Sequence, residues 1–226
     1  SMESGADNIG GIIKTLPSEN TFWARAIAKV LSHPFGAGSS FFRTGSSKPR
    51  EVDTVFGGCY KREVFKKIWL FNEKLIRTQD IEFNKRLKKA GGKILLNPEI
   101  SARYYPQSKL PDFFRHNFID GLWTVFPLKF GVKIFSLRHL IPLFFVSGML
   151  AGMILGTFFF WAKIIFILIF GSYLSAGLFF SLKIAIRQDL RYLFSLPLTF
   201  FCRHFGYGLG SLWGLIKIIY SKTDAE

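Results

Sequence analysis

The stretch from residue 78 to residue 100, TQDIEFNKRLKKAGGKILLNPEI, predicts a helix, a glycine turn and a strand in direct succession. Thr78 is a residue type that caps helix starts, apolar residues then recur with helical spacing, and Gly91 and Gly92 stop the helix. KILLNPEI leaves the glycine pair as a strand. Asp80 therefore lies at the mouth of an amphipathic helix, where a carboxylate can act as a base.

The residues before and after this unit also alternate between strands and helices. Residues 6–13 predict an extended or turn segment, residues 20–32 a helix, and the Gly- and Ser-rich residues 33–50 an irregular, mobile surface loop. Residues 51–56 predict a strand that Gly57 and Gly58 end, and residues 63–68 a short helix. With a further extended piece after residue 100, the pattern is that of an α/β domain.

Composition divides the chain near residue 136. Before that point lie 22 of the 30 basic and 12 of the 15 acidic residues, whereas long apolar runs rich in phenylalanine follow it. We therefore expect three parts: an α/β portion over residues 1–110, an amphipathic helical region over residues 111–136, and membrane helices over residues 137–226. The helix at residues 111–126 interleaves aromatic with polar residues, which fits either the membrane interface or packing on the α/β portion.

Three apolar stretches are candidates for membrane helices. Residues 140–161 and 164–182 carry no charge, each is long enough to span, and Lys163 separates them, so they predict a tight helical hairpin. Residues 192–220 contain Arg203 and His204, and a charged residue at the bilayer centre costs about 3 kcal/mol. This third stretch therefore spans or folds back.

Two glycine repeats occur in these stretches. Gly148, Gly152 and Gly156 lie in the first stretch, and Gly206, Gly210 and Gly214 in the third. Glycine at every fourth position makes a smooth helix face, so these segments either pack on each other or reflect the general frequency of glycine in membrane helices.

The net charge of +15 is better explained by lipid than by nucleic acid. Basic residues flank the apolar stretches, with Lys183, Arg187 and Arg191 in one connection, and no aromatic-and-basic recognition motif is present, so nucleic acid is not an expected partner. The positive-inside bias places this connection and the α/β portion in the cytoplasm. Cys59 and Cys202 lie in different environments, which indicates neither a disulfide framework nor a metal site.

Five segments carry a resemblance to a known family. They are DNIGG at residues 7–11, HPFGAGSSFFRTG at 33–45, EVDTVFGGCYKREVF at 51–65, LFNEKLIRTQDIEFNKRLKKAGGKILLNPEI at 70–100, and the apolar hairpin that follows. Together they are similar to family 2 glycosyltransferases of the bacterial exopolysaccharide, succinoglycan-assembly type. TQDIEFNKRL is the most specific part.

This resemblance implies the C-terminal part of a GT-A, Rossmann-like glycosyltransferase domain followed by a transmembrane region. It also implies an inverting enzyme of the inner (plasma) membrane, multi-pass with its catalytic part in the cytoplasm. Such an enzyme moves a sugar from a nucleotide-sugar donor to a lipid-linked or cell-surface polysaccharide acceptor. The alternative is a non-catalytic, membrane-anchored scaffold or interaction protein derived from that fold.

Asp80 matches the family's catalytic base. An acceptor hydroxyl is a poor nucleophile until a nearby carboxylate takes its proton. The alternative role is stabilisation of the helix start through the helix dipole, worth about 0.3–1 kcal/mol. Glu82 projects elsewhere on the helix and is expected to face solvent.

The candidates for acceptor binding surround this base in the sequence. Gly57 and Gly58 allow close backbone approach to a sugar or simply make a turn, and a lone histidine on an aromatic helix is often structural. Gln79 stands where the family usually has Glu, and Trp69 where it tends to have Gly. The candidates are Gly57, Gly58, Gln79, Asp53, Arg62 and His116.

The complete enzyme is expected to use a divalent cation, Mg²⁺ or Mn²⁺, to neutralise the leaving diphosphate. The motif that binds this ion in the family, Asp-x-Asp, does not occur in the sequence, and no metal ligands are assigned. The chain is therefore interpreted as a C-terminal portion that lacks the donor half and does not catalyse transfer alone.

Overall fold

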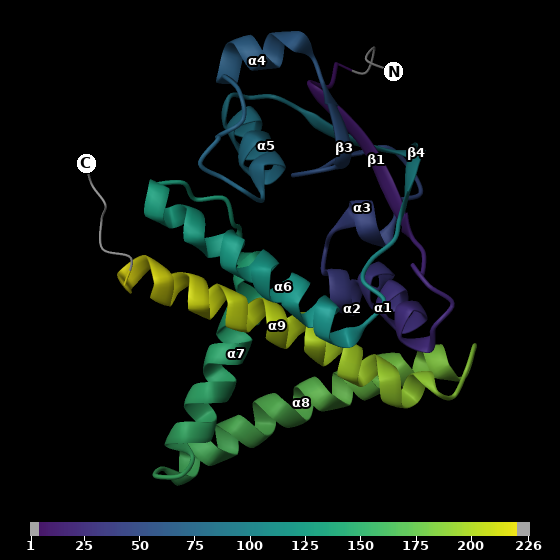
Figure 1. Ribbon diagram of the computed structural model, residues 1–226, viewed down its shortest axis with the longest axis vertical. Coiled ribbons are helices and arrows are strands. Elements are labelled where there is room, and N and C mark those ends of the chain that lie inside the picture. The colour runs from purple at the N-terminus through teal and green to yellow at the C-terminus, as the bar shows by residue number, and fades with distance from the viewer. Residues whose placement is uncertain (1–4, 221–226) are drawn as a thin grey trace.

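The computed structural model describes residues 5–220, which form a small α/β unit above a group of long helices (Figure 1). The sheet has four strands in the order β2-β4-β1-β3. Strand β1 pairs in parallel with β4, and the two outer pairings are antiparallel. The strands are β1 (Asn8–Thr15), β2 (Arg50–Glu51), β3 (Phe56–Tyr60) and β4 (Ile94–Tyr104). The mixed α/β fold class is confirmed.

The DNIGG segment forms the centre of this sheet, and its glycines are required by close approach. A Cβ atom on Gly10 would lie 2.5 Å from the Val55 side chain, and one on Gly11 would lie 2.1 Å from the carbonyl oxygen of Ile100. The register of β1 against β4 shifts at this point, between Gly10 and Ile12. Side chains at either position would force the strands apart.

Five helices complete the α/β unit: α1 (Phe22–Ser32), α2 (Pro34–Ala37), α3 (Phe41–Thr44), α4 (Arg62–Ile68) and α5 (Gln79–Lys89). Helices α4 and α5 pack on β4 through a buried apolar cluster that includes Phe83, Leu87 and Leu96. The expectation of an irregular loop over residues 33–50 was wrong in part, because α2 and α3 lie there. Pro34 at the first turn of α2 and the His33 side chain, which accepts from the Phe35 N–H at 3.1 Å, explain the first of them.

The prediction of a strand at residues 51–56 was also wrong in part, because the strand there, β3, begins only at Phe56. Gly57 and Gly58 do not end a strand but lie within β3, and the residues between β2 and β3 are irregular. Gly57 has φ of 60°, and a Cβ on Gly58 would lie 2.6 Å from Oδ1 of Asn8. The pair therefore lets the edge strand bend past the Asn8 side chain.

The segment between α4 and α5 begins and ends with left-handed backbone. Among residues 5–220, the non-glycine residues with positive φ are Trp69, at 65°, and Thr78, at 63°. Because this region favours glycine, the glycine usual in the family at the position of Trp69 has a conformational reason. Thr78 precedes α5 as predicted, but its side chain does not cap the helix.

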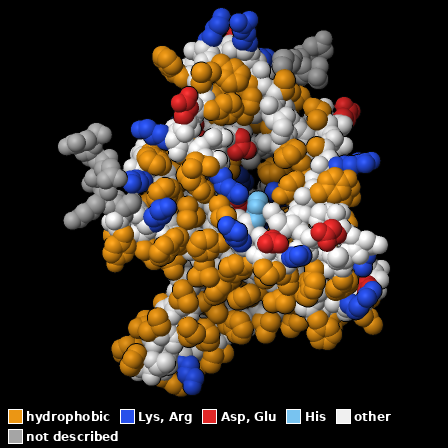
Figure 2. All heavy atoms as spheres, in the orientation of Figure 1, with side chains coloured by type: hydrophobic (Ala, Val, Ile, Leu, Met, Phe, Trp, Pro, Cys, Tyr) orange, Lys and Arg blue, Asp and Glu red, His pale blue; other side chains and the backbone are white. Residues whose placement is uncertain are grey.

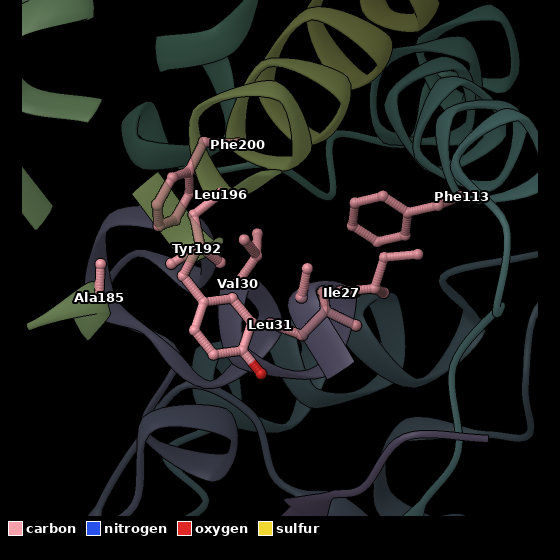
Figure 3. Packing of buried hydrophobic residues seen from close by; sticks show 9 residues of the cluster. Ile27, Val30, Leu31, Phe113, Ala185, Tyr192, Leu196 and Phe200 are labelled. Carbon is pink, nitrogen blue, oxygen red and sulfur yellow. The ribbon is translucent and has the colours of Figure 1, made fainter. Parts of the chain in front are cut away.

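Long helices form the rest of the molecule. They are α6 (Leu110–Val125), the 3₁₀ segment η2 (Phe126–Phe130), α7 (Leu137–Leu155), α8 (Phe160–Ala185) and α9 (Tyr192–Tyr220). A second apolar core joins α1 to this group, with Ile27 and Val30 packed near Phe113 of α6 and Leu196 and Phe200 of α9 (Figure 3). The helices and the α/β unit are therefore held together by a shared core.

Helices α7 and α8 form an open hairpin that projects from the body; they diverge from their connection and are not the tight pair predicted (Figure 1). Both are long and apolar enough to cross a membrane, and the exposed surface over this part is largely hydrophobic (Figure 2). Lys163 lies inside α8 and does not interrupt it. Helix α9 forms as expected, but it is not one of the two candidate spans found within residues 5–220.

The two glycine repeats do not pack on each other; each packs on a different helix. A Cβ on Gly210 would lie 1.9 Å from the carbonyl oxygen of Phe118, so this face approaches the backbone of α6. A Cβ on Gly152 would contact Phe166 of α8 at 3.0 Å. Helices α7 and α9 instead meet at Gly208, where a Cβ would lie 2.3 Å from the Pro142 carbonyl oxygen.

Candidate active site

Asp80 is the second residue of α5, and its side chain is exposed. Removal of water by the surrounding protein raises the pKa of this carboxyl above its ordinary value of 3.8, and hydrogen bonds from the Ile81 and Asp80 backbone N–H groups oppose the shift. The carboxylate is therefore a stronger base than a free aspartate while it stays open to a substrate.

A buried polar network holds this part of α5 on the sheet. Asn84 lies one turn beyond Asp80, and its Oδ1 accepts from Nδ2 of Asn8 at 2.8 Å and from the Tyr60 hydroxyl at 2.9 Å. Its own Nδ2 donates to Thr54 Oγ1 at 3.0 Å. Burial and the nearby Asp80 charge raise the pKa of Tyr60 to about 12, so its hydroxyl keeps its proton.

The expectation that Glu82 faces solvent was wrong. Glu82 is 7% exposed, and its carboxylate forms an ion pair with Arg86 at 2.6 Å. Arg86 also donates to the carbonyl oxygen of Ile68 and, at 2.8 Å, to that of Leu70. Glu82 therefore fixes α5 against the preceding segment and leaves Asp80 as the accessible carboxylate of the first turn.

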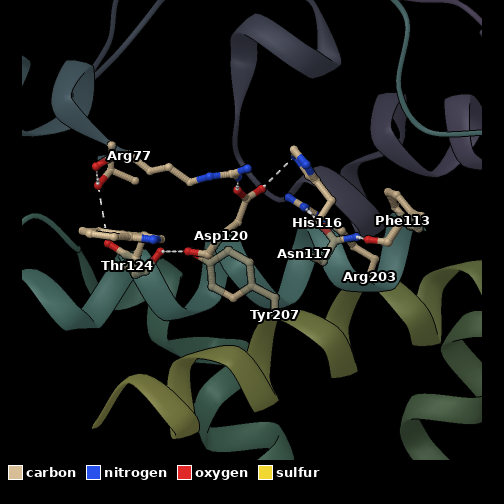
Figure 4. A network of polar contacts seen from close by, with 10 residues as sticks. Arg77, Phe113, His116, Asn117, Asp120, Thr124, Arg203 and Tyr207 are labelled. Carbon is tan, nitrogen blue, oxygen red and sulfur yellow. Dashed lines mark hydrogen bonds and ion pairs between the residues drawn. The ribbon is translucent and has the colours of Figure 1, made fainter. Parts of the chain in front are cut away.

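A second group of polar side chains lies on α6, opposite the start of α5. Asp120 Oδ1 forms an ion pair with Nη1 of Arg77 at 2.6 Å, and its Oδ2 lies 3.3 Å from Nε2 of His116 (Figure 4). Burial lowers the pKa of His116 against the effect of Asp120, and nearby arginines lower it further, so the imidazole is neutral at pH 7. Figure 2 shows the surface hollowed between the α/β unit and the helices, with charged side chains and a histidine around the hollow.

The other predicted site residues do not all meet at Asp80. Gln79 turns its amide back to donate to the Leu75 carbonyl oxygen. Asp53 pairs with Lys88 at 3.0 Å, more than two turns further along α5, and lines a separate cavity of about 230 Å³. Arg62 is exposed at the start of α4, with no ion pair to any residue between 5 and 220.

Sequence reasoning missed Arg43, Arg77, Asn117, Asp120 and Arg203 as parts of this region. Arg203 gave a signal, because a charge in the middle of an apolar stretch requires a partner. Its guanidinium donates to Asn117 Oδ1 and, at 3.2 Å, to the Gly36 carbonyl oxygen. The guanidinium that disfavours α9 as a span is thus hydrogen-bonded by α6, through Asn117, and by α2, through Gly36.

Within residues 5–220, no three His, Cys, Asp or Glu side chains come together closely enough to hold a metal ion. The described residues therefore do not fit the divalent cation implied by the family resemblance.

Comparison with known proteins identifies relatives of the chain. It is 31% identical over 211 residues to the dolichyl N-acetyl-α-D-glucosaminyl phosphate 3-β-D-2,3-diacetamido-2,3-dideoxy-β-D-glucuronosyltransferase of Methanococcus voltae, a match that covers 92% of this chain and 60% of the relative. The homologues of this chain are glycosyltransferases. This agrees with the family 2, exopolysaccharide type that the sequence resembles.

A second relative carries the same indication. The succinoglycan biosynthesis protein ExoA of Rhizobium meliloti (strain 1021) is 27% identical over 142 residues, which cover 56% of this chain and 42% of that protein. The matches thus cover about half of the length of these two curated relatives. No protein-family model matches it, and no solved structure gives a significant match.

Proposed function

We propose that the chain is the acceptor-side and membrane portion of an inverting glycosyltransferase, which moves a sugar from a nucleotide-sugar donor to a lipid-linked or polysaccharide acceptor. The observation that carries this proposal is Asp80, an exposed carboxylate of raised pKa in the first turn of α5, in a chain whose homologues are glycosyltransferases.

In the proposed step, Asp80 is the general base. Its carboxylate takes the proton of an acceptor hydroxyl while the hydroxyl oxygen attacks the anomeric carbon of the donor sugar. The bond from that carbon to the nucleoside diphosphate breaks, and the diphosphate leaves with the electron pair. A raised pKa improves the carboxylate as a proton acceptor near neutral pH, and general bases of this kind contribute about 10²- to 10⁴-fold to rate.

The proposal also includes the cellular location and membrane topology. We infer a multi-pass protein of the inner (plasma) membrane with the α/β unit in the cytoplasm, where nucleotide sugars are available. The apolar helices α7 and α8 and the basic connection before α9 support this. A divalent cation on the donor side remains part of the proposal for the complete enzyme, with ligands other than those described here.

The test is Asp80→Asn in the complete enzyme, with Asp112→Asn as the matched control. Both aspartates are exposed residues in the first turn of a helix, so loss of a favourable charge at the helix start affects both variants. We expect Asp80→Asn to lower sugar transfer about 10²- to 10⁴-fold, with folding and donor binding unchanged, and Asp112→Asn to remain near wild type. Transfer at the wild-type rate by folded Asp80→Asn would refute the assignment.

A further inference from the structure

Three arginines from three separate elements act on His116 of α6. Arg77 comes from the segment before α5, Arg203 from the middle of α9 and Arg43 from α3, and Figure 4 shows Arg77 and Arg203. Arg77 pairs with Asp120, and both Arg43 and Arg203 lie close enough to influence the charge of His116. We call Arg43, Arg77, Arg203, His116 and Asp120 the arginine cluster.

The positive charge of this cluster is not balanced by the residues described. Asp120 supplies one negative charge against three guanidinium groups, and its two carboxylate oxygens are already used by Arg77 and His116. Burial and, after it, the neighbouring Arg203 lower the pKa of Arg43, whereas Tyr104 and Asp120 act in the opposite direction. The cluster is therefore short of about two negative charges.

Arg43 also has a donor without a partner. Its Nη1 is buried, and no residue between 5 and 220 accepts a hydrogen bond from it. The guanidinium instead lies against the ring of Tyr104, with its carbon 5.2 Å from the ring centre. A buried donor of this kind costs free energy unless a ligand accepts from it.

We propose that the arginine cluster binds a phosphate or diphosphate group, and that this group belongs to the lipid-linked acceptor. The second part rests on the proposed function. Guanidinium groups pair with phosphate oxygens through two parallel hydrogen bonds, and a phosphate monoester or diphosphate carries the charge that the cluster lacks.

The position of the cluster favours a lipid over a nucleotide as the source of the phosphate. Arg203 lies on α9, which packs on the candidate span α7 at Gly208, whereas Arg77 lies three residues before Asp80. A phosphate at the cluster would therefore lie between the α/β unit, which carries Asp80, and the group of long helices that includes the candidate spans (Figure 1). An acceptor whose lipid chain stays in the bilayer meets both conditions.

The experiment measures binding by the purified chain in detergent, with farnesyl phosphate, farnesyl diphosphate, inorganic diphosphate and uridine diphosphate as probes. Arg43→Gln, Arg77→Gln and Arg203→Gln each remove one guanidinium. Arg103→Gln, at an exposed residue of β4 outside the cluster, is the matched control. Arg203→Lys keeps the charge without the planar donor pair, and thermal melting checks that each variant is folded.

We expect farnesyl diphosphate to bind at least tenfold more tightly than inorganic diphosphate, each cluster variant to weaken it about tenfold or more, and Arg103→Gln to leave it within twofold. Equal binding by folded cluster variants, or no binding of any probe by the wild type, would overturn the site. Tightest binding of uridine diphosphate would overturn the lipid assignment. Because Asp80→Asn should bind the probes normally, failure of the proposed catalysis is distinguishable from failure of this site.

Discussion

Asn8 of β1 donates a hydrogen bond to Asn84 of α5 at 2.8 Å, and both side chains are inaccessible to solvent or nearly so. This bond joins the DNIGG segment to the TQDIEFNKRL segment, which lie far apart in the sequence. Asn84 follows Asp80 by one helical turn, so the bond also fixes the direction in which the first turn of α5 presents its carboxylate.

Asn84→Ala should destabilise the protein by about 1–3 kcal/mol, because it leaves Asn8, Tyr60 and Thr54 with unpaired polar atoms in a buried position. Asn20→Ala is the control, since Asn20 bonds Arg25 at 2.8 Å on the exposed surface. Chemical denaturation of both variants in detergent measures the difference. Equal stability of the two would show that the network is not important for the fold.

The raised pKa of Asp80 predicts the pH dependence of transfer. The base must be ionised, so kcat/KM should fall as the pH decreases through the pKa of Asp80, and this pKa lies above the ordinary 3.8. A rate profile extended down to about pH 3 should therefore show its acid limb above pH 3.8. Asp112→Asn should leave the limb in place, and a limb at or below pH 3.8 would contradict the desolvated position of Asp80.

Much of the fold follows from local pattern. The helix at residues 79–89, its glycine stop and the strand after it appear as predicted, because spacing and glycine conformation are properties of neighbouring residues. The error at Gly57 and Gly58 has the opposite origin. Gly57 has a positive φ, and Gly58 is needed to clear Asn8, a residue fifty positions earlier; a local pattern cannot distinguish that need from a turn.

The site was only partly predictable for the same reason. Asp80 stands out through its flanking motif, whereas Asp120 and Arg77 become a pair only when α6 is brought against the segment before α5. The spacing of Glu82 from Asp80 predicts a solvent-facing side chain, but its ion pair with Arg86, one turn further along α5, lies in a buried position. Arg203 was visible as an exception to an apolar pattern, although its partners were not.

The close contact of α6 and α9 predicts a sharp difference between two glycine substitutions. A Cβ on Gly210 would lie 1.9 Å from a backbone oxygen of α6, so Gly210→Ala should destabilise the protein by about 1–3 kcal/mol or more. A Cβ on Gly171 of α8 meets nothing within 4 Å, so Gly171→Ala should be neutral or stabilise by up to about 1 kcal/mol. Thermal unfolding in detergent compares them, and equal melting temperatures would argue against this helix packing.

The hairpin of α7 and α8 predicts that Lys163 and the α/β unit lie on opposite sides of the membrane. The two helices are about 28 and 39 Å long, from 19 and 26 residues, and each is sufficient for a hydrocarbon core of about 30 Å. Lys163 lies near the tip of the hairpin and Ser101 on β4, and both are exposed. The basic residues Lys183, Arg187 and Arg191 at the other end favour the cytoplasm for the α/β unit.

The measurement is labelling of single cysteines in intact cells with an impermeant maleimide, in a chain whose natural cysteines are replaced by Cys59→Ser and Cys202→Ala. We expect Lys163→Cys to react in intact cells and Ser101→Cys to react only after the cells are permeabilised. Reaction of both in intact cells, or of Ser101→Cys alone, would contradict the arrangement. The second result would also place the Asp80 carboxylate on the side without nucleotide sugars, and the proposed transfer would fail with it.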